Sequence, residues 1–557
     1  MAIGVSVSTS ELALSGGVPT TTGTAFFAGN TDGGSATAGT LCRSISDFLT
    51  SMSTQYLGRT TFNATMYDTV DTFFREGGQQ CYVVRDVDGT EVAATLTLQD
   101  SVPHPTVVVT SKYSGAAGNN YNVVVTQANA PTFTMTTTNS SANVTAVSSF
   151  ANIAAGTPIS GTNIAANTYV ASVNVAASTL VLSIAATGSS SPTVTPVTFT
   201  VQITDPTGVV LETHGPFINT AALYADTTST IVTFAQSAGG GFTIMSPKAL
   251  TQTTLATGAN GTPTDANAVT ALASFASTLG PGTVALPGRA NTTAWNGLLA
   301  HAAANNRFAA LDMADSTSTS TLVTATGTTS TNANASYGAF FTSTAVIPGL
   351  TAGTTRTVPA SAVVAALRAQ VAATGNDNQM PAGANWPLVY VSSFTNEAFA
   401  TFGQSGINTL QAAGINTFAL YQAKLCLFGF QTPVPSSTEP IFWQANCSCE
   451  RMSLVANAAQ LAGPFLFQAI DGQQLTLTHL QGQLQGMIAK HWQAKALYGA
   501  NATDAGSVNV LAPVNTTATA QAGQLNAQLQ VRLTPSALTV PLGIQFVPVT
   551  QTITQTG

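Results

Sequence analysis

The two ends of the chain carry the clearest alternation of hydrophobic and polar positions. Near the N-terminus, Ile3, Val5 and Val7 alternate with small residues, which is the period-two pattern of a strand with one buried face. Near the C-terminus the alternation returns at Leu525, Ala527, Leu529, Val531 and Leu533, and again at Leu542, Ile544 and Phe546. A Gly- and Thr-rich tether isolates the first strand, and prolines bound the last. Both ends, residues 1–24 and 531–557, are therefore predicted to be extended arms that need a partner sheet.

Between residues 25 and 100 the pattern predicts a strand, a helix and a second strand. The expected elements are a buried strand at Thr24–Gly29, a helix with Tyr67, Val70 and Phe74 on one face, and a strand at Cys81–Val84. The helix face follows the i, i+3, i+7 spacing of an amphipathic helix, and two glycines after it act as a stop signal. This stretch is predicted to be the first part of an α/β core.

Residues 101–220 change to short β-rich runs that Gly, Asn and Pro turns separate. That pattern predicts a β-sandwich or barrel, inserted into the α/β core. Residues 134–196 have a strand-and-turn rhythm of their own and are predicted to form a small β-module nested inside the β-domain. No charged side chain occurs between Tyr113 and Thr204, and we expect this neutral stretch at a solvated periphery.

From residue 221 onward, helices and strands alternate. Helices are predicted on a face formed by Val269, Leu272, Ala276 and Leu279, at residues 292–307, after Pro359, and at residues 446–470 and 474–498. Residues 316–355 lack charge and are rich in Ser and Thr, so a long loop or extended surface is expected there. We divide this part into a central α/β domain at 221–400 and a C-terminal α/β domain at 401–530.

Composition narrows the range of functions. The chain has 15 basic and 22 acidic residues among 557, or 7% charged residues, against about 25% in an ordinary soluble domain. No apolar run approaches the roughly 18 residues of a membrane helix, and the basic residues are scattered rather than clustered as in nucleic-acid-binding proteins. Because net charge keeps most proteins apart in solution, a chain this neutral is expected to self-associate.

Cysteine usage favours a reducing compartment. The N-terminus lacks the basic and apolar regions of a secretory signal, and synthesis in a reducing cytoplasm is the simplest interpretation. An odd number of cysteines, too few for a disulfide scaffold, occurs at Cys42, Cys81, Cys426, Cys447 and Cys449. Buried or free thiols are expected, with a disulfide between subunits as the alternative.

No catalytic, cofactor-binding or metal site is predicted. None of the five histidines lies in a nucleophile or base motif, and the P-loop, dinucleotide and zinc-helix motifs are absent. Cys447 and Cys449 have the wrong spacing for half of a zinc site. Solvated faces or helix caps are the expected roles of the neighbouring acidic residues Asp68, Asp71, Asp312 and Asp315.

Several segments, taken in order, resemble contractile tail sheath proteins of myophages. The most specific is Tyr67–Arg85, which is similar to the helix, double-glycine turn and strand of that family. Ser114–Asn120 is similar to the turn that opens the family's inserted β-domain. The resemblance covers most of the chain except residues 134–196. The positions that carry it include Phe73, Phe74, Gly77, Gly78, Cys81, Tyr82, Arg85, Gly118, Asn119, Pro359, Pro381 and Gly383.

The resemblance implies an α+β multidomain fold, in which an α/β sheath core with a subtilisin-like central domain carries the inserted β-domain and the terminal arms. It implies a structural, non-enzymatic subunit that forms hexameric rings stacked helically around a tail tube. Arms of neighbouring copies would complete a sheet by β-strand addition. Contraction by rigid-body rearrangement would drive the tube through the host envelope.

The implied partners are other copies of the chain, the tail tube protein, and baseplate and tail terminator proteins. No nucleic acid, cofactor or direct membrane insertion is implied. The implied location is the tail sheath of a virion that is assembled in the host cytoplasm.

Two other classes of protein stay open on the sequence. A secreted surface adhesin or S-layer protein would also be rich in Thr, Ala and β-structure, but it would need a secretion signal. A degenerate subtilase-like hydrolase would share the implied central fold, but the G-T-S-M-A nucleophile segment of such enzymes is absent.

Overall fold

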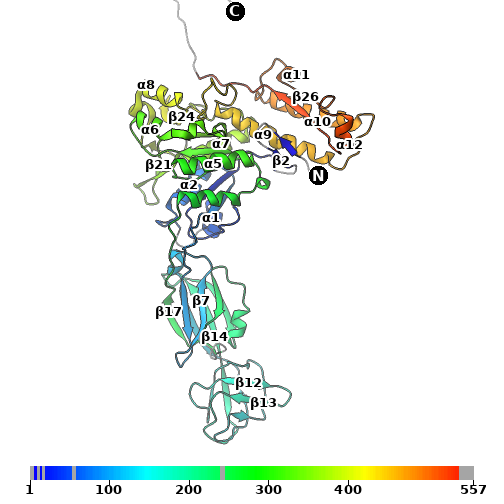
Figure 1. Ribbon diagram of the computed structural model, residues 1–557. Coiled ribbons are helices and arrows are strands. Elements are labelled where there is room, and N and C mark those ends of the chain that lie inside the picture. The colour runs from blue at the N-terminus through cyan, green and yellow to red at the C-terminus, as the bar shows by residue number, and fades with distance from the viewer. Residues whose placement is uncertain (1–5, 9–12, 16–18, 53–57, 239–244, 539–557) are drawn as a thin grey trace, which may run out of the picture.

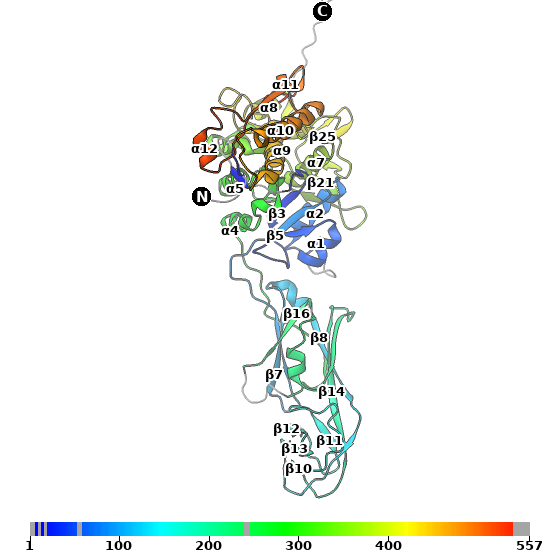
Figure 2. The ribbon, with the colours of Figure 1, turned by 90° about the vertical axis from the view of Figure 1, so that its right-hand side faces the viewer.

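The computed structural model describes residues 6–8, 13–15, 19–52, 58–238 and 245–538. The molecule is long, with an α/β body and the C-terminal helices at one end, β-sheets in the middle and a small β-module at the far end (Figure 1, Figure 2). Several separate sheets are combined with helices in one chain. The mixed α+β, multidomain class predicted from the sequence is therefore confirmed.

An eight-stranded sheet forms the centre of the body, in the order β25-β24-β20-β19-β18-β3-β5-β4. The six central strands are parallel, and the edge strands β4 and β25 run antiparallel to their neighbours. Short, almost wholly apolar central strands are typical of a parallel sheet covered on both faces. The bounds are β3 Ala25–Gly29, β4 Thr40–Cys42, β5 Cys81–Arg85, β18 Thr283–Ala285, β19 Phe308–Asp312, β20 Gly338–Phe341, β24 Ile415–Tyr421 and β25 Lys424–Phe428.

Successive side chains of these strands enter two separate hydrophobic cores, because they point to opposite faces of the sheet. Phe27 and Phe341 belong to one core, and their neighbours Phe26 and Phe340 belong to the other. The first core is covered by α1 Ile45–Met52, α2 Ala64–Arg75, α7 Ala360–Ala373 and α9 Ala445–Ala462. The second is covered by α4 Asp265–Ala271, α5 Thr292–Asn305, α6 Thr319–Thr326 and α8 Ala398–Ala412.

The prediction of a long loop at residues 316–355 is wrong. This stretch holds α6, two short 3₁₀ turns, the inner strand β20 and the strand β21 (Ala345–Pro348). β21 lies between β22 (Thr355–Val358) and β23 (Ser393–Phe394) in a small sheet of its own. Charge is missing here because β20 is buried on both faces, not because the segment is a surface loop.

The middle of the molecule contains two packed sheets with a common core. A three-stranded sheet, β16-β7-β6, lies over a six-stranded one in which β14 pairs with β8 and β15. These sheets reach beyond residues 101–220 at both ends. The bounds are β6 Thr95–Gln99, β7 Pro105–Ser111, β8 Asn122–Asn129, β14 Thr193–Thr204, β15 Val210–Phe217, α3 Thr220–Tyr224, β16 Val232–Gln236 and β17 Leu250–Thr254.

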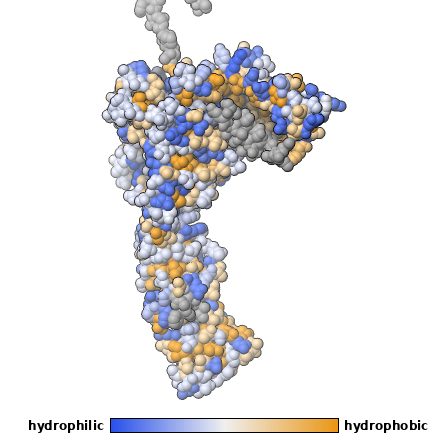
Figure 3. Space-filling view, in the orientation of Figure 1, coloured by the Kyte–Doolittle hydropathy of each residue, from blue (hydrophilic) through white to orange (hydrophobic). Residues whose placement is uncertain are grey.

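The far end of the molecule has a small core of its own, whose buried members lie between Phe133 and Val194. The first residues of β14 pair with β9 and β11, and the rest of β14 continues into the sandwich. Figure 3 shows an apolar area on this part of the surface. The short strands are β9 Phe133–Thr134, β10 Asn143–Val144, β11 Ile159–Gly161, β12 Val170–Asn174 and β13 Thr179–Leu182.

The C-terminal part stands beside the body and has a separate core (Figure 1). The two long helices expected at 446–470 and 474–498 are α9 and α10 (Leu475–Gln493), both shorter than expected. The remaining elements are β26 Gly506–Asn509, β27 Gln528–Val531, α11 Ala502–Ala505 and α12 Thr517–Gln521. The helix expected through Leu279 ends at Ala271 and continues as two 3₁₀ turns.

Candidate assembly interface

The C-terminal sheet is a two-stranded structure built on helix α10. β26 pairs antiparallel with β27, and Val508 lies opposite Leu529. Leu529 and Val531 pack against the core that α10 forms, whereas Gln528 and Gln530 are exposed. The alternation seen in the sequence is therefore that of a strand with one buried face.

Both strands of this sheet keep one edge without a neighbouring strand among the residues that the structure describes. On β26, the carbonyl oxygens of Val508 and Gly506 accept hydrogen bonds from the side chains of Gln481 (2.9 Å) and Gln485 (3.4 Å) of α10. A strand edge of this kind is a template on which another strand can pair. A two-stranded sheet is also marginal by itself, and gains stability from a third strand.

Three residues predicted for the C-terminal arm lie in the C-terminal part, next to α10. Leu529 and Val531 belong to β27, and Leu533 forms a bridge to Leu497 of the same chain. They pair within their own chain because their apolar side chains, which all point to one face, are buried against the apolar stripe of α10. The other predicted arm positions at the two chain ends lie outside the described residues, namely Ile3, Val5, Leu542, Ile544 and Phe546.

The N-terminal strand has a partner in its own chain. β1 (Ser6–Ser8) pairs antiparallel with β2 (Ala13–Ser15), and Val7 lies opposite Leu14. The backbone of this hairpin lies close to α9, and Figure 1 shows β2 beside that helix. The sequence predicted that this strand needs a partner sheet, and one partner is a strand of its own chain. Its addition to a sheet of another copy stays a prediction. Within the described residues, the hairpin is a second two-stranded sheet with free edges.

The most specific sequence motif forms one packed unit at the end of α2. Phe73 is fully buried and Phe74 is half-buried against the same core. Gly77 has a φ of +100°, and a Cβ atom on Gly78 would lie 2.4 Å from the Phe73 ring. The turn thus requires both glycines: Gly77 adopts a backbone conformation that other residues rarely adopt, and Gly78 leaves room for the Phe73 ring.

The strand that follows the turn carries the rest of the motif. Cys81 is fully buried, and the Tyr82 ring stacks on Phe26 with 5.5 Å between ring centroids. Arg85 is buried at the end of the strand, and burial lowers the pKa of its guanidinium. These residues support the fold and lie away from the C-terminal sheet.

Gly118 and Asn119 lie where the chain enters and leaves the sandwich. The Asn119 side chain donates to Gly258 O and accepts from Gly258 N, each at 2.8 Å. Val92 and Ala259 exchange backbone hydrogen bonds nearby, at 2.9 and 3.0 Å. The two connecting segments therefore form a hydrogen-bonded neck rather than two independent linkers.

The remaining motif positions also have structural roles. Pro359 precedes α7 as its N-cap residue. Pro381 is buried, and Gly383, with a φ of +80°, donates from its N–H group to Leu427 O of β25 at 2.8 Å. The motif residues thus serve packing or turns. None of the sequence motifs predicted that the edges of the C-terminal sheet are the candidate interface.

Asp68 and Asp71 are buried, so the solvated face expected for them is wrong. Both carboxylates pair with Arg356, which approaches from β22. Arg59 forms a second ion pair with Asp68, and Arg75 forms one with Asp71. The cluster ties α2 to β22.

Asp312 stabilises the start of helix α7. Of the two roles expected for it, a solvated face or a helix cap, the structure shows a capping role. Its carboxylate accepts hydrogen bonds from the Ser361 N–H (2.7 Å) and hydroxyl (2.6 Å) in the first turn of α7, and from Gly288 N (2.9 Å). Burial raises the pKa of Asp312 to about 6, although these hydrogen bonds lower it. The carboxyl thus joins β19 to α7.

The buried histidines pair with charged groups rather than with a nucleophile. His214 Nδ1 lies 2.8 Å from Asp226 and its Nε2 lies 3.2 Å from Glu212. His301 Nε2 lies 2.7 Å from Arg307 Nη1, and burial lowers the pKa of His301 to about 3. Neither histidine is hydrogen-bonded to a serine or cysteine side chain within the described residues.

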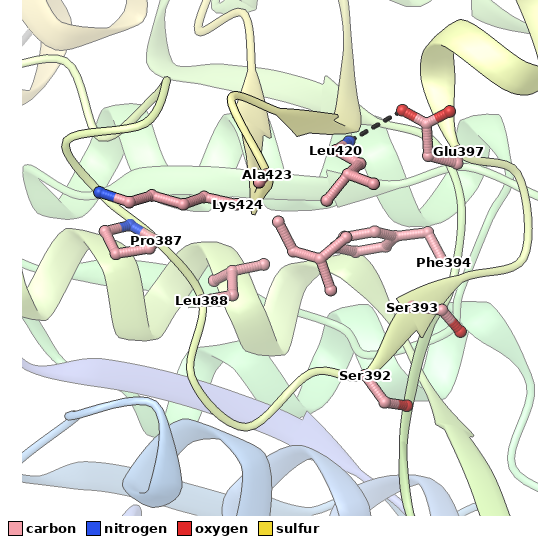
Figure 4. Close-up of a pocket in the computed structure, with 10 residues that line it drawn as sticks. Pro387, Leu388, Ser392, Ser393, Phe394, Glu397, Leu420, Ala423 and Lys424 are labelled. Carbon is pink, nitrogen blue, oxygen red and sulfur yellow. Dashed lines mark hydrogen bonds between the residues drawn. The ribbon is translucent and has the colours of Figure 1, made fainter.

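A hollow of about 540 Å³ lies between β23 and the β24–β25 hairpin (Figure 4). Its walls are mostly apolar, and Glu397 and Lys424 provide its charges. The Glu397 carboxylate accepts hydrogen bonds from Leu420 N and Ala400 N, while Lys424 Nζ donates to Ala384 O at 3.2 Å. Both charged groups therefore have structural partners.

The described residues contain no group of three His, Cys, Asp or Glu side chains that could hold a metal ion. Within the same part of the chain, no helix has the length and hydrophobicity to cross a membrane. All five cysteines are buried as free thiols, in agreement with the expectation. Burial raises the pKa of Cys447 and of Cys449 to about 12.

No protein-family model and no curated protein matches the sequence. Among solved structures, the sheath tail protein of Desulfitobacterium hafniense is similar to this chain, with 12% identity, a TM-score of 0.53, and coverage of 88% of this chain and 90% of that one. The sheath tail protein of Listeria innocua is similar at 11% identity and a TM-score of 0.52, with 88% and 89% coverage. The chain therefore has the fold of these sheath tail proteins.

Proposed function

We propose that the protein is a structural subunit of a contractile bacteriophage tail sheath. The observation that carries the proposal is the sheath fold over 88% of the chain. It is supported by the C-terminal sheet, whose outer edges have no neighbouring strand among the described residues. The low charge of the chain is consistent with a protein that works in an assembly. The subtilisin-like central domain, on this proposal, is a scaffold without catalytic function.

Subunits would join by strand addition. An arm strand from a neighbouring copy would pair along the free edge of β26 or β27 and replace the glutamine side chains that now bond to β26. About four backbone hydrogen bonds at about 0.5–1.5 kcal/mol each, together with burial of the alternating apolar residues of the arm, would hold neighbours while their bodies move. The residues proposed for these arms are Ile3, Val5, Val7, Leu542, Ile544 and Phe546, and the acceptor carries Leu529, Val531 and Leu533.

Hexameric rings of this subunit would stack helically around a tail tube protein and would end at baseplate and tail terminator proteins. Contraction would be a rigid-body rearrangement of the bodies between two packings. The hydrogen-bonded neck supports movement of the body and the sandwich as one piece. The neutral module at the far end would face outward. The location would be the tail of a virion assembled in the host cytoplasm.

The proposal is tested by electron microscopy of the purified full-length protein and of a variant that lacks residues 540–557. Tubes from the intact chain that are lost on truncation are the expected result. The truncated chain keeps the acceptor sheet, so a synthetic peptide of residues 540–557 should bind it.

A peptide with the same residues in scrambled order is the matched control, since it has the composition but not the alternation. Tubes of normal length from the truncated variant would contradict the role of the arm. A monodisperse monomer from the intact chain, even after tail tube protein is added, would contradict the sheath function.

A further inference from the structure

Two cysteines that are 39 positions apart in the sequence face each other in the body sheet. Cys42 ends the edge strand β4, and Cys81 begins its neighbour β5. The antiparallel register places Cys42 directly opposite Cys81. Residues in such a pair have Cα atoms about 4.5 or 5.5 Å apart, and both values lie within the roughly 4.4–6.8 Å that a disulfide spans.

The side chains of this pair share one environment. Both are fully buried in the core that α1, α2 and α7 cover. Burial raises the pKa of the Cys81 thiol, and its hydrogen-bonding contact with the Cys42 thiol raises it further. The two sulfur atoms are thus neighbours in the reduced protein, so little movement is needed to join them.

The other cysteines are placed differently. Cys426 lies in β25, at the opposite edge of the eight-stranded sheet. Cys447 and Cys449 lie on α9 with two-residue spacing, which directs side chains to different sides of a helix. Among the described residues, only Cys42 and Cys81 have another cysteine as the cross-strand partner, whereas Cys426 is paired with Ala419.

We propose that Cys42 and Cys81 are a modification site, at which an oxidant of the small-molecule disulfide class converts the two thiols into a cross-strand disulfide within the chain. One thiolate attacks the disulfide, such as glutathione disulfide, and releases one thiol. The second cysteine thiolate then attacks the mixed disulfide and releases the other. Two protein thiols are oxidised, one small disulfide is reduced to two thiols, and the two protons of the protein thiols pass to the released thiolates.

Access of the oxidant requires local opening of the sheet edge. β4 has three residues and pairs with β5 alone in the body sheet, so its separation breaks few hydrogen bonds. Such local openings occur at much lower free energy than global unfolding. Oxidation is therefore expected to be slow but complete.

The bond would close the chain segment 43–80, which contains α1 and α2, into a covalent loop. Closing a loop of this size restricts the unfolded chain and stabilises the folded one. The edge strand would also be fixed to the sheet. This inference concerns the body alone and does not depend on the proposed sheath function.

The test uses the full-length protein, first reduced and then incubated with glutathione disulfide below its unfolding temperature, with and without mild urea. Thiols are counted by alkylation after unfolding, and linked peptides are identified by mass spectrometry. The number of alkylated cysteines should fall from five to three. One linked peptide should contain Cys42 and Cys81, and the thermal midpoint should rise by several degrees.

Single substitutions provide matched controls. Cys426→Ser should lose two of its four thiols, as the proposal requires, whereas Cys81→Ser should form no linked peptide and show no rise in midpoint. Five alkylated thiols after both treatments would overturn the proposal. A persistent glutathione adduct without the Cys42–Cys81 peptide, or a link to another cysteine, would overturn it as well.

Discussion

At the scale of single residues, this nearly neutral chain uses many of its few charges inside the fold. Arg356 neutralises Asp68 and Asp71, each of which has a side-chain exposure of 3% or less. Arg368 of α7 pairs with Asp377, and the Arg368 side chain is 1% exposed. Buried ion pairs of this kind fix geometry, and the loss of one partner leaves an uncompensated charge in a medium of low polarity.

Arg356→Met should therefore reduce the free energy of unfolding by about 1–3 kcal/mol, since two buried carboxylates lose their shared partner while Arg59 and Arg75 keep one ion pair on each. Arg532→Met is the matched control, because the Arg532–Asp504 pair is exposed, at 63% and 42%, and should cost less than about 1 kcal/mol. Denaturant unfolding of both variants measures the difference. If both variants lose the same free energy of unfolding, the buried cluster stabilises the fold no more than an exposed ion pair does, and the prediction is wrong.

At the scale of elements, the start of α7 depends on a carboxyl group from the neighbouring strand. Asp312 ends β19 and bonds to Ser361 in the first turn of the helix. Negative charge near a helix N-terminus is favourable, but desolvation of this fully buried group outweighs the gain and raises its pKa to about 6.

The raised pKa predicts the pH dependence of stability. An unfolded Asp ionises near pH 4, so between about pH 4 and pH 6 the unfolded chain loses its proton while the folded chain keeps it. This group therefore adds about 3 kcal/mol to the free energy of unfolding below pH 4, and this contribution is lost as the pH rises through 6. Asp312→Asn should lack this decline. Unfolding of both proteins at pH 4, 5, 6 and 7 tests it, and a constant difference would contradict it.

At the scale of the whole molecule, the far module has a core of its own and is joined to the sandwich by the long strand β14. Side-chain hydrogen bonds between Thr157 and Ile218 O and between Asn219 and Ala155 O add to this connection. Asn129 of β8 and Val197 of β14 are directly paired at the boundary. Replacement of residues 130–196 by Asn-Gly should therefore turn β8 and β14 into a hairpin with a two-residue turn.

We expect the shortened chain to keep the thermal midpoint of the body and to form the same tubes as the intact chain, with a smaller outer diameter. The reason is that the module lies at the end opposite the C-terminal sheet (Figure 1). Circular dichroism and electron microscopy measure both properties. Folded protein without tubes would assign the module to the assembly interface, and unfolded protein would show that its core is not independent.

The sequence by itself determined the elements whose signal is local. Period-two alternation identified β27, i, i+3, i+7 spacing and a double glycine identified α2 and its stop, and the turn-rich run identified the β-domain. In these segments the side-chain pattern records directly which face is buried.

Only the tertiary structure decided which partner each element has. β20 lacks charge because it is an inner strand, although its surroundings in sequence are typical of a loop. By pattern, Leu529 and Val531 fit an extended arm and a strand of the C-terminal sheet equally well. They lie in the sheet because the apolar stripe of α10 buries their side chains. Asp68, Asp71 and the pair Cys42–Cys81 meet partners that are distant in the chain. Periodicity reports the burial of a face, but contacts between distant segments arise only from the packing of the complete chain.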